Sequence, residues 1–146
     1  MNESARIYQI LDSGSKKDKI RVLESLSQSS DQETVNKIIS KLDDSEIEVR
    51  GEAFSSLFLN KNDISEFLID ALGSKNKNVK AFSALVLANR GDVNAMPALE
   101  LLVDEIFLSG TAERAKQQVV ESCALGALQY LRAYCLRKGY GGPEGI

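Results

Sequence analysis

Apolar residues recur along most of the chain with the spacing of amphipathic helices. The first clear run ends at Leu42, a short polar segment follows, and a second run begins at Val49. Residues suited to capping a helix precede several runs: Ser30 or Asp31, Asp44 or Ser45, and Asn62 or Asp63. The pattern predicts paired helices at 3–12 and 16–28, 31–42 and 46–59, 63–72 and 77–90, and 94–107 and 111–138.

Two of these pairs share one register. The corresponding positions, 30 residues apart, are Leu42 and Leu72, Val49 and Val79, Leu57 and Leu87, and Arg50 and Lys80. A helical pair of this length buries both apolar faces only when neighbouring pairs stack on it. We therefore expect an all-α fold, an α-solenoid of about four antiparallel helix pairs. It forms a single domain over residues 1–138, and a flexible Gly-rich tail follows at 139–146. The alternative is a helical bundle with coincidental spacing.

Two stretches resemble the HEAT-repeat family, in particular the short repeats of phycocyanin-lyase-like proteins. One runs from Leu42 through Val49 and Arg50 to Ala53, and the other from Leu87 to Leu99. The second contains Gly91, suited to a left-handed helix end, then Asp92, a candidate cap, and Pro97 in the next first turn. The chain departs from the family pattern at Lys80 and Ser83. The resemblance implies the fold; it indicates function poorly, because such repeats serve unrelated roles.

The amino-acid composition excludes several kinds of catalytic and metal-binding site. The chain has no histidine, which removes Ser-His-Asp and Cys-His catalytic systems and the usual zinc ligands. Cys123 and Cys135 lie on one predicted helix about 18 Å apart, too far for a disulfide. We therefore expect no enzyme activity, no cofactor and no metal site.

Charge and hydropathy bear on partners and location. The net charge of −3 gives no general basic surface for nucleic acid. Charged residues interrupt every apolar run within residues 1–25, so no signal peptide is expected there, and no run is long enough to span a bilayer. We expect a cytoplasmic protein that binds neither membrane nor nucleic acid.

Arg21, Arg50 and Lys80 recur at nearly constant spacing on the second helix of each predicted pair. In a solenoid they form a basic ladder. One interpretation is structural, with Arg50 pairing with Asp43. The other is a binding edge for phosphate or an acidic peptide, joined by Lys16, Lys17, Lys19, Lys75 and Lys77.

The last predicted helix has an apolar seam that no later repeat covers. The seam comprises Val120, Ala124, Leu128, Leu131 and Cys135. Either this helix packs on the fourth repeat, or it forms an interface, including a homodimer. Leu128, Leu131 and Tyr134 are the candidate partner-binding residues of this helix.

The leading functional hypothesis is a non-catalytic scaffold or adaptor that binds a protein partner. Two alternatives are nucleic-acid or acidic-ligand binding through the basic ladder and, from the resemblance alone, a bilin-lyase-like chaperone. Two other groups are given structural roles. The acidic residues between Asp43 and Glu52 form a solvated turn, and Phe54, Phe58 and Phe82 fill the core.

Overall fold

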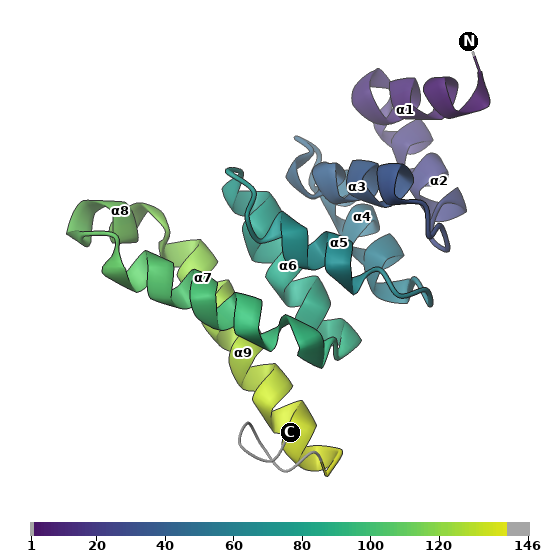
Figure 1. Cartoon of the computed structure of the whole chain (residues 1–146). Helices are drawn as coiled ribbons and strands as arrows, with labels where there is room; N and C mark the ends of the chain where they lie inside the picture. Colours follow the sequence, from purple (N-terminus) through teal and green to yellow (C-terminus); the bar gives the residue numbers. More distant parts are fainter. Residues whose placement is uncertain (1, 140–146) are drawn as a thin grey trace. The chain divides into compact units, whose positions relative to one another are not determined.

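The computed structural model describes residues 2–139, and the regular elements within that range are all helical (Figure 1). This confirms the predicted all-α class. The α-helices are α1 (Glu3–Ser13), α2 (Lys16–Ser25), α3 (Gln32–Ser40), α4 (Ile47–Leu59), α5 (Ser65–Ala71), α6 (Lys77–Arg90), α7 (Met96–Leu108), α8 (Thr111–Lys116) and α9 (Gln118–Arg137). Short 3-10 helices, η1 (Lys41–Asp43) and η2 (Val93–Ala95), precede α4 and α7. Residues 140–146, most of the predicted tail, lie outside the described residues.

The chain divides into two compact units, Met1–Phe67 and Leu68–Ile146, and the boundary falls within α5. A single domain over residues 1–138 was predicted. Each unit is described by itself below.

In the first unit, α1 packs against α2, α3 against α4, and α2 against α4. The second helices of two successive pairs therefore lie against each other. Leu23, Val49 and Leu57 are completely buried, as the apolar pattern predicts. Phe58 was expected in the core, but it is 44% exposed.

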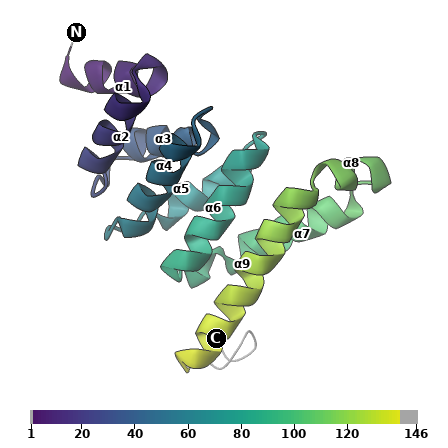
Figure 2. The ribbon, with the colours of Figure 1, turned by 180° about the vertical axis from the view of Figure 1, so that it is seen from behind.

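In the second unit, α9 packs along α6 and also against α7 (Figure 2). The buried side chains of α6 and α9 include many small residues, which allow two helix backbones to come close together. These are Ala81, Ala84 and Ala88 on α6, and Ala124 and Ala127 on α9. Larger side chains, Leu87 and Leu131, are also fully buried in this unit.

The helix ends follow local chemistry. The Asp31 side chain accepts a hydrogen bond from the Thr34 N–H at 3.0 Å and caps α3 as predicted. Gly91 has φ +73° and ends α6 in the left-handed conformation, and Pro97 lies in the first turn of α7. The capping role predicted for Asp92 is wrong, because its carboxylate accepts a hydrogen bond from Arg90 Nε at 2.8 Å instead.

The last predicted helix, 111–138, is two helices. The chain turns at Gln117, where φ is −100° and ψ 13°, between α8 and α9. α8 buries none of its residues, whereas α9 buries the whole predicted seam from Val120 to Cys135. The break therefore falls just before the first seam residue, where packing against α6 and α7 begins to set the helix direction.

Candidate functional site

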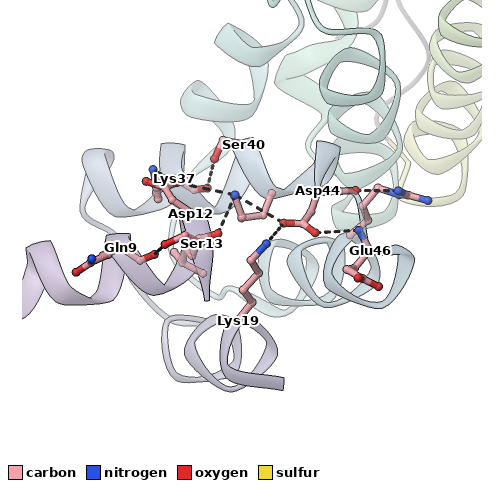
Figure 3. A network of polar contacts seen from close by, with 11 residues as sticks. Gln9, Asp12, Ser13, Lys19, Lys37, Ser40, Asp44 and Glu46 are labelled. Carbon is pink, nitrogen blue, oxygen red and sulfur yellow. Dashed lines mark hydrogen bonds and ion pairs between the residues drawn. The ribbon is translucent and has the colours of Figure 1, made fainter. Parts of the chain in front are cut away.

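Five charged side chains gather where α1, α2, α3 and η1 meet in the first unit (Figure 3). We call these residues, Asp12, Lys19, Lys37, Lys41 and Asp44, the Asp44 cluster. The Asp44 side chain is only 3% exposed, with Lys19 Nζ at 2.8 Å and Lys41 Nζ at 3.7 Å from its carboxylate.

Burial raises the pKa of the Asp44 carboxyl, but the interactions around it outweigh this effect. Lys19 and the Glu46 N–H donate hydrogen bonds to it, and the charges of Lys19 and Lys41 add to the effect. The net pKa lies below its ordinary value, so Asp44 is ionised at neutral pH. The nearby lysines are held as well: Lys41 donates to the Leu11 carbonyl at 2.9 Å, and Lys37 pairs with Asp12.

The Asp44 cluster ties helices together and does not resemble a reactive site. Each oxygen of its buried carboxylate already accepts a hydrogen bond, one from Lys19 and one from the Glu46 N–H, and its lowered pKa makes it a weak base near neutral pH. Within residues 2–139, no three Asp, Glu or Cys side chains lie close enough together to hold a metal ion.

The residues of the predicted basic ladder have different surroundings. Arg21 is exposed, with Asp18 3.8 Å away. The Arg50 guanidinium donates to the main-chain carbonyl of Asp44 at 2.8 Å, a structural role like the one expected with Asp43. Lys80 belongs to the other unit, so the three residues are not brought together within one unit.

Ion pairs also occupy part of the predicted basic edge. Lys16 Nζ pairs with Glu48 at 2.9 Å, and Lys19 belongs to the Asp44 cluster. Of the remaining lysines, Lys17, Lys75 and Lys77 are exposed. The edge is therefore interrupted by neutralised positions.

Lys80 is half-buried and lines a cavity of about 170 Å³ between α6, α7 and α8. Glu105, Glu113 and Gln117 line the same cavity, and the Gln117 Oε1 atom is buried without a hydrogen-bond partner. A larger, open cavity of about 650 Å³ lies beside Phe107 and Arg114. The Arg114 guanidinium stacks on the Phe107 ring at 4.6 Å, and it also pairs with Glu121.

The candidate residues of α9 lie in the interior of the second unit. Leu128 is 4% exposed and Leu131 is completely buried, so a partner cannot contact these side chains directly. Tyr134 is half-buried, and its ring lies against the backbone of Gly91. The burial of these three residues therefore agrees with the alternative in which the last helix packs on its own chain.

The opposite side of α9 is exposed and carries no charged residue from Val119 to Leu136, and it was not predicted as a binding surface. We call Val119, Ser122, Gly126, Gln129, Ala133 and Leu136 the outward face of α9. All six are exposed, Val119 to 69% and Leu136 to 66%, and they recur at alternating spacings of three and four residues. A side chain at Gly126 would meet nothing within 4 Å, so the packing of the chain itself does not require glycine there.

None of the helices in residues 2–139 is long and apolar enough to cross a membrane. Comparison of the sequence with protein-family models and with curated proteins finds no match.

Proposed function

We propose that this chain is a HEAT-like repeat module that acts as a non-catalytic scaffold or adaptor in the cytoplasm. It binds a protein partner through the outward face of α9. The observation that carries the proposal is the exposed, uncharged face of a twenty-residue helix, with Val119 and Leu136 at its ends and Gly126 near its centre.

The packing within each unit supports the repeat interpretation. In a solenoid, the second helix of one pair contacts the second helix of the next. α2 contacts α4 in the first unit, and α6 contacts α9 in the second. In this scheme α9 is the last helix of the stack within residues 2–139, and its outward face is the side that α6 and α7 leave exposed.

Gly126 supports a binding role for that face. Glycine in the middle of a helix costs about 0.5–1 kcal/mol relative to alanine. Apart from the nearby backbone of α9 itself, no atom of residues 2–139 lies within 4 Å of the position where its side chain would begin. A small residue there is useful where another backbone approaches closely, and the neighbouring Ser122 and Ala133 are small too.

The basic ladder gives less support to binding of nucleic acid or an acidic ligand. Such binding needs free cationic groups in a continuous patch. Arg50 donates to the Asp44 carbonyl, and Lys16 and Lys19 are paired with carboxylates. The bilin-lyase-like role rests on the family resemblance alone.

Photo-crosslinking tests this proposal. A photoreactive phenylalanine analogue placed at Gln129 on the outward face should crosslink to protein in a cell extract. The control carries the same group at Lys17, an exposed position of α2. Crosslinked protein from position 129 and none from position 17 supports the proposal. No crosslink from position 129, or equal crosslinking from both positions, contradicts it.

A further inference from the structure

We propose that the partner of the outward face of α9 is a second copy of this chain, with the two α9 helices packed antiparallel. This inference rests on the proposed function and names the partner of the same face. Two features carry it, the symmetry of the face and the distribution of charge at its ends, and the size of the face sets the expected strength.

The outward face is complementary to itself when one helix is reversed. Its positions pair symmetrically about the midpoint between residues 127 and 128. Val119 then lies opposite Leu136 of the second copy, Ser122 opposite Ala133, and Gly126 opposite Gln129. The largest apolar side chains meet each other at the two ends, the small residues Ser122 and Ala133 meet next, and at the centre Gly126 leaves room for the longer Gln129 side chain of the second copy.

Charge favours the antiparallel orientation. Between Val119 and Leu136 the face carries no charged residue, so this part of the contact does not bury an unpaired charge, and Arg137, which is in line with Val119 along the helix, lies at its C-terminal edge. At the C-terminal end, Arg137 and Lys138 have no carboxylate partner among the described residues. At the N-terminal end the charges are balanced by two ion pairs, Arg114 with Glu121 and Lys116 with Glu113.

A parallel dimer would bring the two basic ends together, whereas an antiparallel dimer places each basic end beside a balanced one. The helix dipoles also favour the antiparallel dimer, because in it the positive end of one helix lies beside the negative end of the other. Both effects disfavour the parallel arrangement.

The size of the face sets the expected strength. From Val119 to Leu136 the helix rises about 26 Å and is about 10 Å wide. This footprint is small beside the roughly 800 Å² that each partner buries in a standard interface. We therefore expect a reversible dimer that forms at high protein concentration.

Disulfide trapping tests the register. The variant Ser122→Cys/Ala133→Cys is made in a Cys123→Ser background; Cys135 is completely buried and stays in place. The two new cysteines are separated by about 16 Å along one helix, beyond the roughly 7 Å limit for a disulfide, so they cannot join within one chain. In the antiparallel dimer each faces its counterpart, and mild oxidation should convert most of the protein to covalent dimer.

Two controls test whether the crosslink depends on the antiparallel register. Each single cysteine variant should remain largely monomeric, because positions 122 and 122 of the two copies lie far apart. The Cys123→Ser chain without new cysteines is the second control, and it should give no covalent dimer. Equal rates in all variants, or rapid crosslinking by Ser122→Cys alone, would overturn the antiparallel register.

The outcomes separate this inference from the proposed function. If residue 129 crosslinks only to a different protein and Ser122→Cys/Ala133→Cys gives no covalent dimer, the self-association is wrong and the proposed function stands. If neither experiment gives a crosslink, both are wrong.

Discussion

The ring of Tyr134 occupies the space that a side chain at Gly91 would need. A Cβ atom built on Gly91 would lie 2.9 Å from Tyr134 Cζ, and the backbone at Gly91 has φ +73°. The residue that ends α6 is therefore also a contact for α9. Sequence alone explained Gly91 by its backbone conformation and assigned Tyr134 to a partner, but the structure joins the two residues inside the second unit.

Gly91→Ala should destabilise the protein for two reasons, strain at positive φ and collision with the Tyr134 ring. Strain alone costs about 1–2 kcal/mol for a residue with a side chain. The control is the same substitution in a Tyr134→Ala background, where the strain at positive φ remains and the ring contact is absent. We expect Gly91→Ala to lose at least about 1 kcal/mol more in the wild-type background than in the Tyr134→Ala background in urea unfolding. Equal losses would show that the ring contact does not matter.

Asp44→Asn should lower the free energy of unfolding at pH 7 by about 3 kcal/mol, because Lys19 and Lys41 lose their buried partner. Since the pKa of Asp44 is lowered on folding, its contribution is present above the ordinary carboxyl pKa of 3.8 and is lost as the pH falls further. The difference between wild type and variant should therefore shrink below pH 4.

Chemical denaturation at pH 7 and pH 3 measures this difference. Glu48→Gln, which removes the exposed pair with Lys16, should leave stability nearly unchanged at both pH values. A variant difference for Asp44→Asn that is the same at pH 3 and pH 7 would contradict the role assigned to its carboxylate.

Ser83→Ala should raise the free energy of unfolding, because the Ser83 hydroxyl is buried without a hydrogen-bond partner. The expected gain is up to about 1 kcal/mol, since removing an unpaired buried polar group relieves its desolvation cost. Ser56→Ala should do the opposite, because the equally buried Ser56 Oγ donates to the Leu23 carbonyl at 2.9 Å. Thermal unfolding of the two variants checks the contrast, and a loss of stability in Ser83→Ala would show that its hydroxyl has a partner.

Leu131→Ala should destabilise the chain by about 2–5 kcal/mol, as expected for a leucine buried within its own unit. Leu136→Ala, on the outward face of the same helix, should change stability by less than about 0.5 kcal/mol. Denaturation at low protein concentration, where self-association is absent, makes the comparison. Equal effects would mean that the orientation of α9 differs from the one described.

The helix positions were largely predictable because their signals are local. Asp31, Gly91 and Pro97 mark helix ends through their own backbone and capping chemistry, and the structure places helix ends beside them. The turn at Gln117 was not predictable in this way, because no glycine or proline marks it. It arises where burial of the α9 seam begins, which depends on helices distant in sequence.

The candidate site was harder to predict for the same reason. Lys19 reaches Asp44 across 25 residues, a distance over which local patterns carry no information. On α9, the apolar seam and the outward face have similar periodicity. The seam was predicted as a binding surface because Leu128 and Leu131 are large and apolar, but the chain itself buries these two residues.

Solution mass as a function of protein concentration tests most directly the claim that the outward face of α9 is the association surface. Gly126→Glu places a charge on that face and should not weaken the fold, because a Cβ atom added there would meet no other part of the described residues within 4 Å. Gly51→Glu is the control, an exposed helical glycine of α4 with equally open surroundings. We predict that wild type and Gly51→Glu rise from 16.0 kDa toward twice that mass with concentration, while Gly126→Glu stays at the monomer mass. A wild-type chain that stays monomeric throughout, or a Gly126→Glu chain that associates as strongly as wild type, would contradict the account.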